Sequence, residues 1–466
     1  MRKVLLILLL SITGNLFAQE ITCDKPGITD AYNLAINTID INTRRGILAA
    51  GGDYGGEWTR DIAINSWNGV SILRPRVAEK SLWSVTINRD TIGHQYWDKI
   101  IWVIAAYNHY KVTGDKEFLR QAYKCSVNSM KGLEQMAFDS KYSLFTGPSV
   151  FNDGIAGYPE PIYDSSNPSS YVLDHKNAKS IKCLSTNCLY YGAYTALVRM
   201  GQILNENEVT TQMYQGKAKN LRANILKNLY SEKENKLYYL IDNEGKVDKS
   251  QEGLGISFAV LFGVIDRTQA NKLIQNANTS KFGITSIYPD FPRYSSEKPG
   301  RHNNIIWPMV NGFFAQASIL AGNQASFTHE LNCLTQLALD SDKGDYNFRE
   351  IYNPYTGAPD GGWQTDHHWD SCKHQTWSAT AYVSMVIYGL AGIRIENDSM
   401  SFSPFLPNDI HHLEINHIKY RQADLKIILK GNGNRIKSFL LNGKKQASHK
   451  ISSQLKGSNV ISIELE

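Results

Sequence analysis

Two acidic residues, Asp153 and Glu350, stand in loops whose composition suits a general acid and a general base. Apolar residues surround Asp153 in the sequence, namely Phe151, Ile155 and Tyr158. Such surroundings partly desolvate a carboxyl group, which raises its pKa and favours the protonated form. Glu350 stands just before a Tyr-Asn-Pro turn, where a carboxylate can activate water. We therefore predict Asp153 as proton donor and Glu350 as base of a hydrolytic reaction.

The loop that contains Asp153 leaves two alternatives open. Asp153 precedes Gly154, and Asp-Gly is ordinary turn chemistry, so the residue could serve only to shape a turn. Glu160, near the end of the same loop, is the alternative proton donor. The sequence alone does not decide between Asp153 and Glu160.

The histidines in these loops do not predict a metal site. His367 and His368 are adjacent, and neighbouring side chains of an extended segment point to opposite sides. His94 has no second histidine or cysteine at ligand spacing beside it. We predict neither a metal nor another cofactor.

Aromatic and hydrogen-bonding side chains are interleaved in the same loops. This pairing suits a sugar ring, which has an apolar C–H face and a rim of hydroxyl groups. The predicted substrate-binding residues are Trp58, Arg60, Asp61, Trp97, Asp98, Trp307, Trp363 and Gln364. A place in the hydrophobic core is the alternative for Trp97 and Trp307. For Asp61 the alternative is a helix N-cap joined to Arg60 by an ion pair.

The loops alternate with segments of helical apolar periodicity from about residue 28 to residue 395. We expect about a dozen helices arranged as a ring of helical hairpins, with the long loops carrying the site. The expected helices include 29–42, 96–110, 186–204, 214–229, 253–262, 268–277, 306–321, 325–340 and 376–389.

The character of the sequence changes after Gly392, where short alternating strands separated by turns replace the helices. The expected strands are 393–402, 413–420, 425–429, 436–441 and 460–465. We therefore predict a signal segment at 1–18, a helical catalytic domain at 19–391 and a small β-sandwich at 392–466.

The first 18 residues have the plan of a secretory signal: Arg2 and Lys3, an apolar run, then small and apolar residues before the expected cleavage site. We predict a periplasmic or secreted protein that does not insert into a membrane. Removal of this segment would lower the formal net charge from +5 to +3, too little for a nucleic-acid partner. Cys183 and Cys188 are close enough for a disulfide, although free buried thiols are an equal alternative.

Taken together, these motifs resemble the six-hairpin glycoside hydrolases, in particular the processing α-glucosidase I, amylo-α-1,6-glucosidase and trehalase-like group. The segments that carry the resemblance are Trp58 to Asp61, Trp97-Asp98, Thr113 to Asp115, Glu350 to Gly357, Gln375 to Ala379, Gly389 to Ile393 and Phe402 to Pro407. The resemblance implies an (α/α)6 barrel, mainly α, and an inverting mechanism with Asp153 as acid and Glu350 as base. Unlike many relatives, this chain passes from its signal almost directly into helices.

We therefore expect an oligosaccharide or polysaccharide substrate and exo action on an α-linked glucoside. An α-mannosidase or α-rhamnosidase on the same barrel is an alternative. A glycoside phosphorylase needs an acid but replaces the base with a phosphate site, so Glu350 favours water as the nucleophile. A saccharide-binding protein without catalysis and a polysaccharide lyase are further alternatives. The sequence predicts no oligomeric state.

Overall fold

A computed structural model describes residues 21–466, so the predicted signal segment lies outside the described residues. Six helices form an inner ring in which each packs against the next, and the last, α13, packs against the first, α2. These inner helices are α2 (Thr59–Asn65), α5 (Ile101–Thr113), α7 (Leu184–Leu204), α9 (Gly253–Leu261), α11 (Pro308–Ala321) and α13 (Thr376–Ser384). Every residue of α13 is buried, as expected of a helix that has neighbours on all sides.

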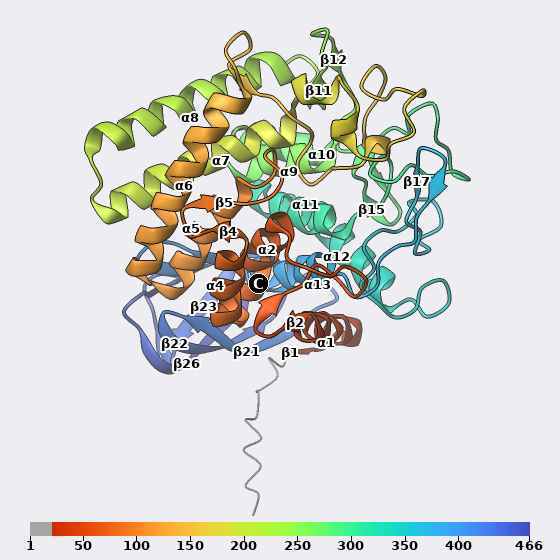
Figure 1. Ribbon diagram of the computed structural model, residues 1–466. Helices are drawn as coiled ribbons and strands as arrows, with labels where there is room; N and C mark the ends of the chain where they lie inside the picture. The colour runs from red at the N-terminus through yellow and green to blue at the C-terminus, as the bar shows by residue number, and fades with distance from the viewer. Residues whose placement is uncertain (1–20) are drawn as a thin grey trace, which may run out of the picture.

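Six outer helices surround this ring, one for each inner helix (Figure 1). They are α1 (Pro26–Ile41), α4 (Pro75–Ser84), α6 (Lys116–Ala137), α8 (Glu208–Leu229), α10 (Arg267–Gln275) and α12 (Gln324–Leu339). The outer helices are amphipathic. In α6, for example, Phe118, Leu119, Ala122 and Tyr123 are buried at helical spacing, whereas most residues between them are not. The (α/α)6 barrel predicted from the sequence is confirmed.

Short helical turns extend the inner ring or shape its loops. They are η1 (Ser66–Val70), α3 (Ser71–Leu73), η2 (Ile155–Gly157), η3 (Val172–Asp174), η4 (Ala178–Ser180) and η5 (Met385–Leu390). Two-residue strands stiffen the loops: β2 (Thr43–Arg44), β3 (Ile47–Leu48), β4 (Thr86–Ile87), β5 (Thr91–Ile92), β6 (Phe138–Asp139), β7 (Leu144–Phe145), β8 (Lys182–Cys183), β9 (Tyr230–Ser231), β10 (Lys236–Leu237), β11 (Leu240–Ile241), β12 (Val247–Asp248), β13 (Gln251–Glu252), β14 (Thr279–Ser280), β15 (Gly283–Ile284), β16 (Ile287–Tyr288), β17 (Trp363–Gln364) and β18 (His367–His368).

Two sheets follow the barrel, as the strand pattern after Gly392 predicts. One has the strand order β1 (Ile21–Cys23), β21 (His412–Tyr420), β22 (Gln422–Lys430), β26 (Lys456–Leu465), β23 (Ile436–Leu441) and β24 (Lys444–Lys445). The other contains β19 (Ile393–Ile395), β20 (Ser399–Phe402) and β25 (Lys450–Ser452). Alternate residues of β22 are buried, which is the two-residue period of a strand with one face on a core.

The first described strand, β1, belongs to the C-terminal sheet, where it pairs antiparallel with β21 so that Ile21 lies opposite Ile415. Figure 1 shows β1 beside β21 at the end of the molecule where the C-terminal strands lie. The two ends of the described chain are therefore held in one sheet. The domain boundaries at residues 391 and 392 stay a prediction.

One expected helix starts later than its apolar pattern indicates. The segment 96–100 forms turns, and α5 begins only at Ile101. The amides of Ile101 and Trp102 bond to carbonyls three residues earlier, at Asp98 and Lys99, which is the tighter 3₁₀ pattern. This matters because Trp97 and Asp98 then lie in a turn and not on the face of a helix.

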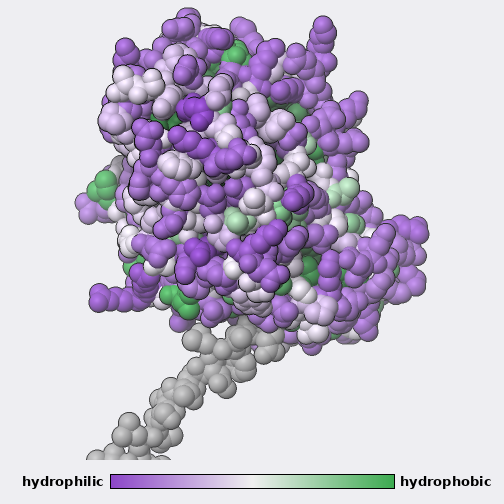
Figure 2. Space-filling model, turned by 90° about the vertical axis from the view of Figure 1, so that its right-hand side faces the viewer, coloured by the Kyte–Doolittle hydropathy of each residue, from purple (hydrophilic) through white to green (hydrophobic). Residues whose placement is uncertain are grey.

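Two other sequence predictions concern the surface and the cysteines. Among the described residues, no helix has both the length and the apolarity of a membrane span. Figure 2 shows a face that is mostly hydrophilic, with isolated hydrophobic residues. All six cysteines are free and buried, which agrees with the alternative of buried thiols and not with a bond between Cys183 and Cys188.

The closure of the inner ring gives a first prediction. A Cβ atom at Gly312 of α11 would lie 2.6 Å from the Cβ and 2.9 Å from the Cα of Ala381 in α13. We expect Gly312→Ala to lower the free energy of unfolding by about 1 to 3 kcal/mol, because the two helices must separate. Gly132→Ala on outer helix α6, where nothing lies within 4 Å, should raise it by about 0.5 to 1 kcal/mol. Chemical denaturation of both variants measures this, and equal effects would contradict the packing described.

Candidate active site

A cavity of about 250 Å³ lies at the N-terminal ends of several inner helices, among the long loops. Seven of the residues predicted from the sequence line it: Trp58, Arg60, Asp61, Asp153, Trp307, Glu350 and Gln364. The structure therefore brings the predicted acid and the predicted base into one cavity, from loops 197 residues apart in the sequence.

A larger cavity of about 440 Å³ lies towards the C-terminal ends of the inner helices. Its charged lining residues are the basic Lys111, Arg199 and Arg394, and no aspartate or glutamate is among the residues that line it. It lacks the two carboxyl groups that general acid–base hydrolysis requires. The smaller cavity is therefore the candidate active site.

Two residues from other loops hold the carboxylate of Glu350. The Arg301 guanidinium donates from Nη2 to Glu350 Oε1 at 2.9 Å, and the Tyr54 hydroxyl donates to Oε2 at 2.9 Å. Arg301 Nη2 also lies 3.2 Å from the Tyr54 oxygen, which links the two partners. Glu350 itself is only 4% exposed, so these contacts satisfy a buried charge and fix the direction of its oxygens.

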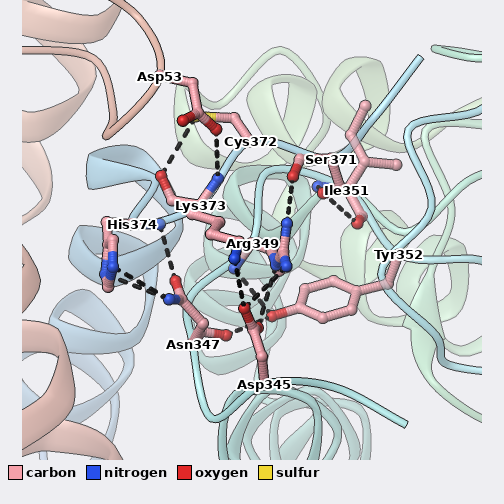
Figure 3. Close-up of polar contacts among 10 residues, drawn as sticks. All are labelled: Asp53, Asp345, Asn347, Arg349, Ile351, Tyr352, Ser371, Cys372, Lys373 and His374. Atoms are coloured by element: carbon pink, nitrogen blue, oxygen red, sulfur yellow. Dashed lines mark hydrogen bonds and ion pairs between the residues drawn. The ribbon is translucent and has the colours of Figure 1, made fainter.

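A second network fixes the backbone on both sides of Glu350, and Figure 3 shows the flanking residues that form it, between Asp345 and Tyr352 and between Ser371 and His374. The amide of Glu350 donates to the carbonyl of Cys372 at 3.0 Å. Arg349 forms a two-point ion pair with Asp345 and donates to the carbonyl of Ser371 at 2.6 Å. The amide of Ile351 donates to the Ser371 hydroxyl at 2.9 Å. The segment of Glu350 is thus fastened to the segment that leads into α13.

Asp153 is held mainly by Arg60. Its Oδ2 atom accepts a bond from Arg60 Nη2 at 2.9 Å, and Gln95 Nε2 lies 3.5 Å from the same oxygen. The backbone carbonyl of Asp153 accepts from the amide of Val172 at 2.9 Å, so the loop is paired with a second loop segment. The side chain remains 28% exposed, unlike Glu350. Each of the two carboxylates is therefore paired with a different arginine.

The glycine after Asp153 allows this loop to approach its neighbours closely. A Cβ atom at Gly154 would lie 1.8 Å from Gln364 Nε2 and 2.5 Å from His302 Nδ1. Gln364 Oε1 in turn accepts from the amide of Ala156 at 2.8 Å. Gln364 therefore lines the cavity, as predicted, and also fastens the loop that carries Asp153.

Arg60 forms ion pairs with three carboxylates. Besides Asp153, its guanidinium lies 3.6 Å from Asp98 Oδ2 and 3.8 Å from Asp61 Oδ2. It also hydrogen-bonds Gln95 and lies over the ring of Trp58, 5.0 Å from its centre. One positive charge thus faces three acidic groups, which cannot all ionise without leaving uncompensated negative charge in a buried place.

The pKa values in this cluster differ from those expected from the sequence. Burial raises the pKa of Asp61 to about 7 and that of Asp98 to about 7, although Arg60 opposes both shifts. Burial acts to raise the pKa of Asp153, but the attraction of Arg60, together with that of Arg301, outweighs it, so the pKa is lowered. The prediction of a raised pKa for Asp153 is therefore wrong, although burial acts in that direction. The sequence does not show that Arg60 forms an ion pair with this residue.

Several residues that line the cavity have buried polar atoms without a hydrogen-bond partner among the described residues. These buried atoms are His302 Nδ1, the Nε1 atoms of Trp307 and Trp377, and both side-chain polar atoms of Gln375. Buried polar groups are normally hydrogen-bonded, and those of a ligand site find partners on the ligand. Donors and acceptors mixed with indole rings suit a polyhydroxylated ring.

His302 is uncharged in this setting. Burial lowers the pKa of its imidazole to about 3, and Arg301 acts in the same direction. The ring stacks on Trp307 with centres 4.7 Å apart and an angle of 12° between the planes. A neutral imidazole can both donate and accept hydrogen bonds, so His302 adds a polar edge to an otherwise aromatic wall.

Three predicted binding residues do not line the cavity. Trp97 and Asp98 are both 0% exposed, and the Trp97 ring packs with Tyr158 and Ile155 behind the loop of Asp153. Trp363 precedes Gln364 on strand β17, and adjacent residues of a strand face opposite sides, so its ring turns away towards Lys298. Glu160, the alternative acid, is exposed and outside the cavity lining.

Several residues that line the cavity were not predicted from the sequence: Tyr54, Tyr171, Arg301, His302, Trp369, Gln375 and Trp377. Gln375 and Trp377 stand inside a segment that carries the family resemblance, but no binding role was predicted for them. Arg301 and His302 stand just before the Asn-Asn-Ile-Ile-Trp segment of Trp307. Their position beside a predicted binding residue is the feature of the sequence that could have indicated a role in the site.

Comparisons with known proteins agree with this architecture. The family model of the mannosylglycerate hydrolase MGH1-like glycoside hydrolase domain matches residues 100–378. No curated protein matches the chain in sequence. Among solved structures, a sialidase has a TM-score of 0.72 at 15% identity, covering 94% of this chain and 41% of its own. A GH78 rhamnosidase of Bacillus sp. GL1 has a TM-score of 0.66 at 12% identity, covering 96% and 44%.

This chain thus spans less than half the length of these two proteins. A GH63 mannosylglycerate hydrolase from Thermus thermophilus is matched over 99% of its length and 76% of this chain, with a TM-score of 0.58 at 14% identity. At these identities the structural matches show a shared fold, whereas the family model covers more than half of the chain. The chain therefore belongs to the mannosylglycerate hydrolase MGH1-like family of glycoside hydrolases.

Proposed function

We propose that this glycoside hydrolase is exported and that it releases a terminal α-linked sugar, a glucoside or a related residue, with inversion at the anomeric carbon. One observation carries the proposal: Asp153 and Glu350 line one cavity from separate loops, and each is held by its own arginine. An inverting pair must stand about 6.5 to 9.5 Å apart to leave room for a water molecule, and carboxyl groups with separate supports on separate loops suit that arrangement.

In this mechanism Glu350 is the base and Asp153 is the acid. Glu350 takes a proton from a water molecule, whose oxygen forms a bond to the anomeric carbon from the side opposite the leaving group. The glycosidic C–O bond breaks, and the leaving oxygen receives the proton of Asp153. The products are a free sugar of inverted configuration and an alcohol. Protonation of Glu350 and deprotonation of Asp153 are then reversed by solvent.

The size of the cavity supports action on a chain end. Its volume of about 250 Å³ is below the roughly 300 to 1,000 Å³ typical of sites for drug-sized ligands. One sugar ring fits such a volume better than a continuous chain does. Trp58, Trp307, Trp369 and Trp377 supply the aromatic walls on which its C–H faces can lie.

The identity of the sugar has a second candidate. Solved structures with this fold include a mannosylglycerate hydrolase and a rhamnosidase, which makes an α-mannoside or α-rhamnoside the principal alternative to an α-glucoside. A phosphorylase needs a phosphate site in place of the base, and here that position is occupied by the buried Glu350.

Export is inferred from the predicted signal at residues 1–18 and can be checked by N-terminal sequencing of the secreted protein.

The first test is a screen of α-linked gluco-, manno- and rhamno-oligosaccharides, followed by NMR of the anomer first released. We expect the β-anomer from the α-linked substrate and an equal rate with and without phosphate. Release of the α-anomer would contradict inversion. A sugar phosphate would indicate a phosphorylase, and binding without any released sugar would indicate a saccharide-binding protein.

The two carboxyl groups make a second prediction. Asp153→Asn and Glu350→Gln should each lower kcat by a factor of about 10² to 10⁴ while saccharide binding, measured by calorimetry, persists. Glu160→Gln is the matched control, because Glu160 is exposed and lies outside the cavity lining. Loss of activity in Glu160→Gln with full activity in Asp153→Asn would identify Glu160 as the general acid.

The shared cluster predicts the pH dependence. Asp61, Asp98 and Asp153 titrate together around Arg60, so their protons belong to the cluster as a whole. Because the pKa values of Asp61 and Asp98 are raised to about 7, the cluster keeps a proton below that pH and loses it above. We expect kcat/KM to fall as pH rises through about 7. A plateau extending to pH 9 would show that the cluster does not supply the proton.

A further inference from the structure

Asp98 belongs to the cluster that Arg60 forms with Asp61, Asp98 and Asp153. Its presence there is not explained by a contact with substrate. It lies in the turn before α5, is 0% exposed, and does not line the cavity. Neither of its carboxylate oxygens has a hydrogen-bond partner among the described residues. It forms an ion pair with Arg60, whose Nη1 lies 3.6 Å from Oδ2.

A buried carboxyl group without hydrogen bonds is costly, so its place in the fold requires a reason. The position of Arg60 gives that reason, because its planar guanidinium presents separate N–H groups to separate acceptors. Nη2 contacts Asp153 on the cavity side, and Nη1 contacts Asp98 on the buried side. The same cation therefore bridges an acidic group in the cavity and an acidic group behind it.

We propose that Asp98 is a positioning residue that shares Arg60 with Asp153, and that this sharing keeps a proton available to the general acid. The inference rests on the proposed function, in which Asp153 donates the proton. If Arg60 were committed to Asp153 alone, the ion pair would lower the pKa of Asp153 still further. As pH rises through about 7, Asp98 loses its proton, and its negative charge then offsets part of the positive charge of Arg60.

The other titratable groups around the cluster do not provide this balance. They are Asp61 beside Arg60, Lys99 beside Asp98, and Arg301, His302 and Glu350 in the cavity lining. Arg301 favours ionised Asp153 but is paired with Glu350, and His302 is uncharged. Asp61 lines the cavity, where a bound sugar can engage it. Asp98 alone is fully enclosed, so its effect on Arg60 persists when substrate is bound.

The test is Asp98→Asn in the full mature chain, assayed on whichever α-linked substrate the wild type cleaves. We expect the alkaline limb of kcat/KM to move to lower pH by about 1 unit, because only Asp61 then still opposes the action of Arg60 on Asp153. Asp98→Glu retains the charge and should restore the limb. An alkaline limb that stays in place in Asp98→Asn overturns the proposal.

Glu330→Gln is the matched control. Glu330 is also 0% exposed and its pKa is raised to about 7 by burial, but it lies on outer helix α12 and bonds to Ile284 and Asn311. Loss of its charge should change stability and leave the alkaline limb in place. A shift as large as that of Asp98→Asn would assign the effect to a general change in the barrel.

A second measurement does not depend on turnover. In a ¹³C NMR titration of aspartate carboxyl carbons, the Asp153 signal, identified by its absence in Asp153→Asn, should titrate about 1 pH unit lower in Asp98→Asn. In the wild type the Asp98 and Asp153 signals should each show two inflections, because coupled groups report each other's titration. Independent single inflections overturn the proposal even if Asp98→Asn does not fold. If no glycoside is cleaved, the proposed function fails, and the titration still tests the sharing of Arg60.

Discussion

The packing of α13 against α2 is the constraint on which the site depends. It closes the inner ring, and so it brings the loop before α2 beside the loop before α13, although more than 300 residues separate them. Tyr54 then reaches Glu350, and the amide of Thr376 donates to the carbonyl of Ala50. An open arrangement of the same hairpins would leave these loops apart and would form no cavity.

The closed ring also explains why the site can be rigid although it is made of loops. Glu350 is fastened through its own amide, Arg301 and Tyr54, while the loop of Asp153 is fastened through Gln364. Rigid placement of charged groups is what transition-state stabilisation requires, because no reorganisation is then needed during the reaction. The unequal burial of the two carboxylates agrees with unequal roles.

The sequence predicts elements well and side-chain directions poorly. Apolar periodicity depends on local geometry, so helices such as α7 and α11 are predicted to within two residues. The directions of the Trp97 and Asp98 side chains depend on a 3₁₀ turn, and that of Trp363 depends on which face of its strand the residue occupies. Composition shows neither feature. The lowered pKa of Asp153 and the role of Arg301 arise from pairs distant in sequence, which periodicity cannot show.

The most direct test of the account is a crystal structure of Asp153→Asn with an uncleaved α-linked oligosaccharide. The proposed mechanism predicts a terminal sugar in the cavity, with the glycosidic oxygen within hydrogen-bond distance of residue 153 and a water molecule between Glu350 and the anomeric carbon on the opposite side. A sugar bound with its glycosidic oxygen away from residue 153, or with no room for water beside Glu350, would contradict it.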